Sequence, residues 1–234
     1  MLYAAAIGLC PATDLHRQYL AVKPQLDNST ISGVGCLLFA GQRLVLEIQK
    51  PHKWTHAPGQ SPVIGVGCIG GHIEAGETPL QTLQREAVEE IQCGIDLWSA
   101  RQTAAISPAE VRLLDGFTLD GLVPAMVWEI AGPGLTAGFK VAVYLGRTMA
   151  DPQPDDLPAI ILAQANFIET LDAGAMTVQQ ARDAGAQFRT RIDLPANGRL
   201  VAANSLRCLL DLRQTHPSLY REFTSVTTGP SDDQ

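Results

Sequence analysis

The chain has 234 residues, of which 46% are hydrophobic and 18% charged, a composition typical of an ordinary soluble globular protein. Its formal net charge of -7 argues against a surface that coats a nucleic acid polymer, whereas a free nucleotide could still bind through a metal ion. No apolar stretch approaches the length that crosses a bilayer, so we expect no membrane partner.

The cysteines are odd in number, scattered and without CxxC spacing, which favours buried reduced thiols in a cytoplasmic protein over a disulfide framework or a zinc site. They are Cys10, Cys36, Cys68, Cys93 and Cys208. Residues 1–10 are apolar, but no Lys or Arg precedes them, so a signal peptide is poorly supported. We treat residues 1–30 as an N-terminal extension whose start packs on the domain as a strand or a helix.

Residues 33–49 predict a β-hairpin, because an apolar run and an alternating segment flank a turn at residues 40–42. A polar loop follows over residues 50–62 and contains His52, Trp54 and His56. The two histidines form only a weak metal pair and favour surface or substrate contacts. The Trp54 indole could stack on a nucleobase or anchor the loop in the core, and the sequence does not decide between these roles. Residues 63–69 predict a strand.

The next stretch predicts a glycine-rich loop and one short helix. Thr78 can cap the helix, Pro79 suits its first position, and Thr78 with Gln81 has the capping-box spacing. Apolar residues recur at intervals of 3, 4 and 4 and predict one buried stripe. They are Leu80, Leu83, Ala87 and Ile91.

Three carboxylates, Glu86, Glu89 and Glu90, lie together on a different face of this helix. Like charges at this spacing cost roughly 0.2–0.5 kcal/mol, and carboxylates near a helix C-terminus also oppose the helix dipole. A divalent cation such as Mg²⁺ or Mn²⁺ accounts for the cluster, since it prefers carboxylate oxygens. From the helix alone, a solvated acidic face is an equally good interpretation.

The spacing of glycine and charged residues over Gly71–Cys93 resembles the Nudix box, G-x5-E-x7-R-E-U-x-E-E-x-G-U with U a bulky apolar residue. The matching residues are Gly71, Glu77, Arg85, Glu86, Glu89 and Glu90. Two positions depart from the pattern. Ala87 is a small U residue, and Gln92 replaces a glycine, although Gly94 follows. The second departure could move the end of the helix by a turn.

A competing pattern, G-x-G-x-x-G, is formed by Gly65, Gly67 and Gly70 and is typical of dinucleotide-binding folds. That fold needs the helix to begin within the glycines, so that its N-terminus meets a pyrophosphate. Because Pro79 opens the helix about nine residues later, we favour a structural role in which the glycines let a strand bend close to its neighbours.

The resemblance implies an α/β fold, a Nudix-type α/β/α sandwich around a mixed β-sheet, over about residues 33–170. Farther along, we predict strands at 96–106, 122–130, 139–145 and 159–170, and a loop at 149–158. Helices are predicted at 177–187 and 200–214. We expect a single domain over residues 1–223 with a C-terminal helical segment at 171–223, followed by a flexible tail at 224–234.

The resemblance also implies hydrolysis of a pyrophosphate bond in a nucleoside diphosphate linked to another moiety, such as a nucleotide sugar, ADP-ribose or a dinucleotide. Glu86, Glu89 and Glu90, with the backbone carbonyl of Gly70, would then bind Mg²⁺ or Mn²⁺. Arg85 and Glu77 would form a structural ion pair between helix and loop.

The general base stays open, because relatives use a box glutamate or an acid from a later loop. The candidates are Glu86, Glu129, Asp155, Asp156 and Glu169. Asp155 and Asp156, with Trp54, are also candidates for substrate binding.

Residues 107–108, a Ser-Pro pair, lie near where ADP-ribose-cleaving members of the Nudix family carry a proline. The resemblance therefore favours an ADP-ribose substrate, but only slightly, because such a pair is also an ordinary turn. A nucleotide-binding or regulatory module with weak catalysis is the alternative function. The sequence leaves the oligomeric state open, and a homodimer is suggested only by analogy with relatives.

Overall fold

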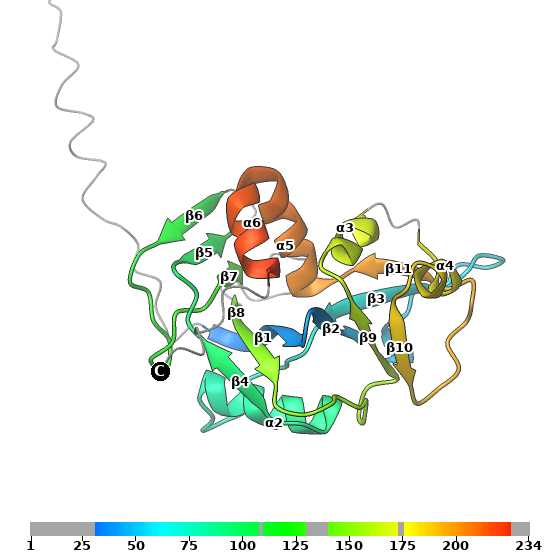
Figure 1. The fold of residues 1–234 in the computed structure, drawn as a ribbon, viewed down its shortest axis with the longest axis horizontal. Helices are drawn as coiled ribbons and strands as arrows, with labels where there is room; N and C mark the ends of the chain where they lie inside the picture. The colour runs from blue at the N-terminus through cyan, green and yellow to red at the C-terminus, as the bar shows by residue number, and fades with distance from the viewer. Residues whose placement is uncertain (1–30, 108–109, 130–139, 173–175, 226–234) are drawn as a thin grey trace, which may run out of the picture.

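The computed structural model describes residues 31–107, 110–129, 140–172 and 176–225. Within these ranges the chain forms an eleven-stranded mixed β-sheet with helices on both faces (Figure 1). None of the described helices combines the length and the apolar character that a membrane-crossing helix needs.

The elements follow one another in an order that brings strands from the whole described chain into one sheet. The strands are β1 (Ile31–Ala40), β2 (Arg43–Ile48), β3 (Val63–Cys68), β4 (Ile95–Trp98), β5 (Thr103–Ile106), β6 (Val111–Leu114), β7 (Met126–Glu129), β8 (Lys140–Thr148), β9 (Ala159–Ala163), β10 (Gln187–Thr190) and β11 (Arg199–Ala202). The helices are the 3-10 helix η2 (Pro51–Lys53) and the α-helices α2 (Pro79–Ile91), α3 (Asn166–Asp172), α4 (Val178–Asp183), α5 (Asn204–Thr215) and α6 (Pro217–Thr224).

The hairpin of β1 and β2 is the centre of the sheet, and it forms as the sequence predicts. Its two-residue turn is Gly41-Gln42, and Gly41 takes φ 59°, a conformation that glycine adopts without steric cost. β1 also pairs in parallel with β8, while β2 pairs antiparallel with both β3 and β9. The β1 and β2 strands are therefore enclosed by neighbours, and β3, which leads into the glycine-rich loop, is anchored directly on β2.

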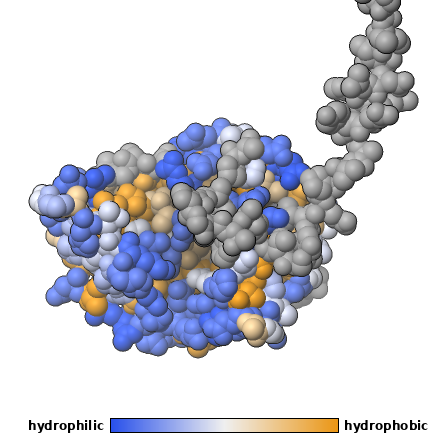
Figure 2. All heavy atoms as spheres, turned by 180° about the vertical axis from the view of Figure 1, so that it is seen from behind, coloured by the Kyte–Doolittle hydropathy of each residue, from blue (hydrophilic) through white to orange (hydrophobic). Residues whose placement is uncertain are grey.

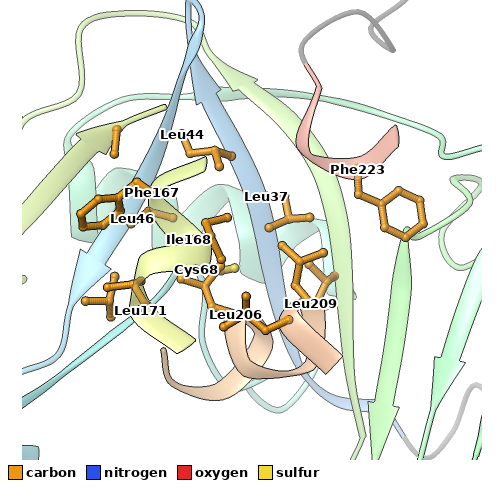
Figure 3. Close-up of a cluster of buried hydrophobic side chains, with 14 of the residues drawn as sticks. Leu37, Leu44, Leu46, Cys68, Phe167, Ile168, Leu171, Leu206, Leu209 and Phe223 are labelled. Atoms are coloured by element: carbon orange, nitrogen blue, oxygen red, sulfur yellow. The ribbon is translucent and has the colours of Figure 1, made fainter. Parts of the chain in front are cut away.

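Helix α2 covers one face of the sheet, and α3, α5 and α6 cover the other (Figure 1). The predicted stripe on α2 is confirmed, since Leu83, Ala87 and Ile91 are fully buried against side chains of the sheet. On the opposite face, Figure 3 shows α3 and α5 side chains gathered over β1, β2 and β3. This arrangement is the predicted α/β/α sandwich.

Two strands predicted before β8 differ from the structure in their bounds. The strand expected at 96–106 is two strands, because the chain bends between Ser99 and Gln102 and passes from a pairing with β8 to a pairing with β7. The strand expected at 122–130 begins only at Met126. Pro124 lacks the N–H that a ladder position needs, which accounts for the late start.

Helix and strand are exchanged in three predictions after residue 159. The strand expected at 159–170 ends at Ala163, and its second part is α3, whose Phe167, Ile168 and Leu171 face the core at helical spacing. The helix expected at 177–187 ends at Asp183, and the helix expected at 200–214 begins only at Asn204. β11 occupies the residues that precede this helix.

The strands β6, β10 and β11 and the 3-10 helix η2 were not predicted, whereas α6 lies within the segment expected to be helical. The strands have four residues each, too few for a period of two to be distinguished from a loop. β10 and β11 lie within the segment predicted to be helical, and both belong to the sheet through β9 and β3. The segment 171–223, expected to be helical, thus contains the helices α4, α5 and α6 together with two strands.

The surface seen from behind is mainly hydrophilic, and hydrophobic residues form small separate areas on it (Figure 2). The cysteines of the described chain fit the prediction of reduced thiols. Cys36, Cys68 and Cys93 are buried, Cys208 is half-buried, and all four are free. Burial raises the pKa of each of these thiols, which keeps them protonated. Cys10 and the predicted N-terminal extension lie outside the described residues.

Candidate active site

Helix α2 begins and ends where local chemistry dictates. The Thr78 side chain accepts a hydrogen bond from the Gln81 N–H at 3.3 Å, and the Gln81 side chain accepts one from the Thr78 N–H at 2.9 Å. This is the predicted capping box, and Pro79 opens the first turn. At the other end, Gln92 takes the left-handed conformation (φ 55°, ψ 26°) that glycine usually provides. The helix thus ends at Ile91 although the box glycine is missing.

The glycine-rich loop before α2 is fixed on β1 through Gly70. Its φ of 144° lies in a region that side chains disfavour, and a Cβ there would lie 2.2 Å from the Val34 carbonyl oxygen. The Gly70 N–H donates to Glu90 Oε2 at 3.1 Å. The loop and the last turn of α2 are therefore joined directly.

Arg85 ties the loop to the helix through a fork of hydrogen bonds. Its Nε donates to Glu77 Oε1 at 2.8 Å and its Nη2 to Glu77 Oε2 at 3.1 Å, so the pair is bidentate. Its Nη1 reaches Glu86 Oε1 at 2.9 Å and Glu89 Oε2 at 3.0 Å. The hydrogen bonds from Arg85 and from the Thr82 hydroxyl lower the pKa of Glu77 to about 2. One guanidinium thus offsets the repulsion among three box carboxylates.

Glu90 is the most buried of the box acids, with 6% of its surface exposed. Its pKa is raised well above the usual range, first by burial and then by the nearby charge of Glu47 on β2. Burial raises the pKa of Glu86 as well, although Arg85 opposes this shift. Burial also raises the pKa of Glu47, to about 7. Together these carboxylates form an electrostatically strained group that an added cation would stabilise.

A cavity of about 400 Å³ opens beside this group, between the box and the ends of strands from both halves of the chain. Its charged lining residues are Glu47, Lys50, Lys53, Glu86, Glu90 and Asp156. Trp128 of β7 and Ser205 of α5 also line it, and the Trp128 indole N–H donates to the Ser205 hydroxyl at 3.2 Å. The site therefore offers carboxylates, two lysines and an aromatic ring to one ligand.

The glycines of the competing G-x-G-x-x-G pattern give room to side chains of this cavity. Gly65 and Gly67 lie within β3, and the helix begins only at Pro79, so the dinucleotide-binding interpretation does not apply. A Cβ on Gly65 would lie 2.0 Å from Gln49 Oε1, and a Cβ on Gly67 would lie 2.3 Å from Glu47 Oε1. The glycines thus let side chains of β2 and of the residue after it lie across β3.

The loop predicted at 149–158 docks on the C-terminal end of α2. The backbone N–H groups of Gln153, Asp155 and Asp156 donate to the carbonyls of Ile91, Glu90 and Glu89 at 2.9–3.0 Å. These carbonyls belong to the last turn, where a helix lacks its own partners. The loop therefore fixes the part of the helix that carries Glu89 and Glu90.

The two aspartates predicted in this loop have different surroundings. The Asp156 carboxylate lines the cavity and pairs with Lys50, while the Asp155 carboxylate pairs with Arg191 at 3.0 Å. Glu89 of the box is not among the lining residues, and its side chain is 52% exposed. The site thus combines Glu86, Glu90 and Asp156 but leaves Asp155 and Glu89 at its edge.

The other predicted residues lie outside the cavity lining. The Trp54 indole N–H donates to the Gln49 carbonyl at 2.6 Å, and the half-buried ring packs on the core, which favours the anchoring alternative. His52 and His56 are exposed. Glu169 pairs with Arg213 at 2.8 Å on the face covered by α3 and α5, and Glu129 ends β7. Of the Ser-Pro pair, residue 108 lies outside the described residues.

Sequence reasoning missed Glu47, Lys50, Lys53 and Trp128. Glu47 was placed in an alternating strand, where a single acid is indistinguishable from a solvent-facing residue. The residue paired with Glu47 is a possible signal. Gly67 on β3 lies opposite Glu47 on β2 and leaves room for the longer side chain. That pairing becomes visible only once the register of the strands is known.

The donor set fits a hard divalent cation. Among the described residues, no three Asp, Glu, His or Cys side chains stand close enough to form a ready metal site. Glu47, Glu86 and Glu90 nevertheless line one cavity, where burial first and repulsion from neighbouring carboxylates second raise the pKa of each. Carboxylate oxygens are the ligands that Mg²⁺ and Mn²⁺ prefer.

The fold and the site together define an α/β protein whose glycine-loop–helix segment presents acids to a ligand cavity. The family model described as the NUDIX domain matches residues 30–114, which include the hairpin, the glycine-rich loop and α2. Residues 30–114 are therefore a NUDIX domain, as the box predicts. No curated protein sequence matches the chain.

Solved structures resemble the chain at low sequence identity, and two of the three described here are named as Nudix hydrolases. A Nudix hydrolase from Clostridium perfringens shares 15% sequence identity with this chain and has a TM-score of 0.38. The aligned part covers 60% of this chain and 84% of that protein's chain. A Nudix hydrolase from Nitrosomonas europaea shares 12% identity, covers 72% and 98%, and has a TM-score of 0.41. The E. coli dihydroneopterin triphosphate pyrophosphohydrolase shares 15% identity, covers 59% and 82%, and has a TM-score of 0.34. The assignment does not depend on these likenesses.

Proposed function

We propose that the protein is a divalent-metal-dependent hydrolase that cleaves a pyrophosphate bond in a nucleoside diphosphate linked to another moiety. Mg²⁺ or Mn²⁺ is the proposed cofactor. Nucleotide sugars, ADP-ribose and dinucleotides are the proposed substrate classes. The observation that carries the proposal is the meeting of box carboxylates and two lysines in one cavity of about 400 Å³.

Each part of this cavity has a task that the reaction requires. A bound divalent ion would neutralise pyrophosphate charge and lower the pKa of a coordinated water. Glu86 and Glu90 lie where they can hold that ion, and the Gly70 N–H orients Glu90. Lys50 and Lys53 would attract the phosphate oxygens of a substrate to this cavity, although the protein as a whole has a net negative charge. Trp128 offers an aromatic surface in the same cavity.

Arg85 has a positioning role in this proposal. It is bidentate with Glu77 of the loop and contacts Glu86 and Glu89 of the helix, so its contacts fix the loop relative to the acids. The Gly70 carbonyl stays a proposed metal ligand, since the residue lines the cavity. Asp156 is the proposed general base among the loop acids, because it lines the cavity whereas Asp155 does not.

A nucleotide-binding module with weak catalysis is the second candidate. One observation favours it: Glu86 and Glu89 are engaged by Arg85 at 2.9 and 3.0 Å, and recruiting both to a metal would require this fork to rearrange. Glu90 makes no such pair with any residue that the structure describes. The two candidates therefore differ in whether bound nucleotide is hydrolysed.

Phosphate and nucleotide release from a panel of substrates separates the two candidates. The panel holds nucleotide sugars, ADP-ribose, dinucleotides and nucleoside triphosphates, each with Mg²⁺, Mn²⁺ or EDTA. The proposed hydrolase releases a nucleoside monophosphate from at least one diphosphate derivative, only with metal. A rise in melting temperature with nucleotide and metal, but no product, supports the binding module instead.

A further inference from the structure

Glu47 of β2 lies directly opposite Gly67 of β3 in the antiparallel register. Side chains of directly opposed residues are neighbours, and glycine leaves its half of that space empty. A Cβ on Gly67 would lie 2.3 Å from Glu47 Oε1 and 3.0 Å from its Cγ, so the Glu47 side chain lies across the glycine. β3 leads directly into Gly70 and Gly71, and the Glu47 carboxylate thereby joins the lining of the box cavity.

The Glu47 carboxylate lies among other charges with no hydrogen bond of its own in the described chain. Glu86 and Glu90 repel it, and only the Lys53 and Lys50 ammonium groups attract it. Glu90 also lacks a hydrogen-bond donor for one of its oxygens. The Gly70 N–H donates to Oε2, while Oε1 accepts no hydrogen bond from the described residues. A cation bound in the cavity would offset the repulsion among these carboxylates.

Gly71 shows the same adaptation on the other side of the cavity. A Cβ there would lie 2.1 Å from Glu86 Oε1, so this glycine makes room for a second carboxylate. Two glycines around one cavity thus each leave space for a glutamate from a different element, β2 and α2. The Glu86 oxygen in this space accepts a hydrogen bond from Arg85 at 2.9 Å, whereas the Glu47 oxygen beside Gly67 accepts none from the described residues.

We propose that the Glu47 carboxylate is a ligand of the divalent cation that Glu90 binds, so that the metal site is assembled from β2 as well as from the box helix. This inference rests on the proposed function. Glu47, Glu86 and Glu90 then provide three carboxylates, and Gly67 is the residue that admits the third. Glu89, outside the cavity lining and held by Arg85, is not needed for this set.

The direct test is Glu47→Gln, which keeps the size of the side chain and removes its charge. Mn²⁺ binding to the full-length protein without substrate is measured by calorimetry or by electron paramagnetic resonance. We expect the dissociation constant for Mn²⁺ to rise at least about tenfold, since even outer partners of a metal ligand are worth 10- to 100-fold. The melting temperature without metal should stay unchanged or rise, because a repelling charge is removed, while its increase on adding Mn²⁺ should shrink.

Gly67→Ala tests the same idea while Glu47 stays in place. The new Cβ meets the far end of a flexible side chain, so the Glu47 carboxylate must turn away from the position that the glycine allows. Mn²⁺ affinity should fall as in Glu47→Gln. The double variant should lose no more than Glu47→Gln alone, because both changes act through one carboxylate.

Asp96→Asn is the matched control, since it removes an exposed carboxylate paired with Arg147 outside the cavity. It should bind Mn²⁺ like the wild type. If the wild type binds no Mn²⁺ at millimolar concentration, the proposed function itself fails. If Glu90→Gln loses Mn²⁺ and Glu47→Gln keeps it, only the role of Glu47 is overturned, even if turnover falls. If Glu47→Gln does not fold, Gly67→Ala decides, and unchanged affinity there rejects the role of Glu47.

Discussion

Glu90 lies where the last turn of α2 meets the glycine-rich loop, and its two oxygens have different surroundings. Oε2 accepts the Gly70 N–H at 3.1 Å, whereas Oε1 accepts no hydrogen bond from the described residues and is available to a ligand. Its residue is 6% exposed, and Glu47 adds a like charge nearby. A carboxylate in this position is costly by itself, which favours a functional role over a solvated one.

Replacing Glu90 with Gln should abolish metal-dependent turnover without unfolding the protein. The amide oxygen can still accept the Gly70 N–H, and the loss of a repelling charge should leave the melting temperature unchanged or higher. Turnover of the best substrate under saturating Mg²⁺ is the measurement, and Glu169→Gln, outside the cavity lining, is the control. Activity within a few-fold of wild type would reject the role of Glu90.

The Glu77–Arg85 pair makes stability depend on acid pH. The pKa of Glu77 is lowered from 4.5 to about 2 by Arg85 and Thr82, so this carboxylate binds its proton less readily in the folded state than in the unfolded state. Its contribution to stability is fully present above pH 4.5 and is lost as the pH falls toward 2. Glu77→Gln should therefore have a lower melting temperature than wild type at pH 7. Between pH 5 and 2 its melting temperature should fall less than that of wild type.

Melting temperatures of both proteins at several pH values between 7 and 2 test this prediction. Because Glu77 is partly exposed, water and salt screen the pair, and the difference should shrink in 1 M salt. Glu74→Gln is the control, because Glu74 is an exposed carboxylate close to Glu77 in the same loop. Parallel curves for Glu77→Gln and wild type would show that the pair contributes nothing to acid stability.

At the scale of elements, α2 was predictable because its signals are local. Thr78, Pro79 and Gln81 mark its start within four residues, and the apolar stripe marks its buried face. β10 and β11 were not predictable for the converse reason. Each has four residues, and its strand state depends on a ladder with β9 or β3, both remote in sequence. Tertiary pairing overrides weak local preference in such short segments.

The end of α2 gives a prediction that separates backbone from side chain. Gln92 takes a left-handed conformation that costs a non-glycine residue roughly 1–2 kcal/mol. Gln92→Gly should therefore raise the free energy of unfolding by up to about 1 kcal/mol, because glycine adopts this conformation freely but loses more entropy on folding. Urea denaturation at pH 7 measures this change.

Gln92→Ala is the matched control, since alanine shortens the side chain but keeps the backbone strain. It should leave the free energy of unfolding near that of wild type. If Gln92→Gly were destabilising, contacts of the Gln92 side chain would have to outweigh the strain, and the helix end would depend on that side chain.

At the scale of the whole molecule, the site is assembled from parts that the sequence keeps far apart. The box alone predicted Glu86, Glu90 and the ion pair of Arg85, because a fixed spacing on one loop and helix encodes them. Glu47 and Trp128 reach the same cavity only through the pairing of β2 with β3 and of β7 with β8. Such long-range registers carry no local signature, and this half of the site could not be predicted.

The C-terminal segment completes the fold, and removing it tests the proposed single domain. β11 pairs with β3, the strand that leads into the box, while α5 and α6 bury Leu206, Leu209 and Phe223 on the sheet. A chain ending at residue 175 exposes this face of the sheet. Each large buried side chain that is lost costs about 2–5 kcal/mol of the free energy of unfolding, so the three together exceed the usual stability of a domain. We expect it to lose its cooperative thermal transition and the dispersion of its amide spectrum.

A chain ending at Ser225 keeps every described element and should melt within about 5 °C of the full chain. If the shorter chain melted just as cooperatively, the box and its hairpin would be an independent domain.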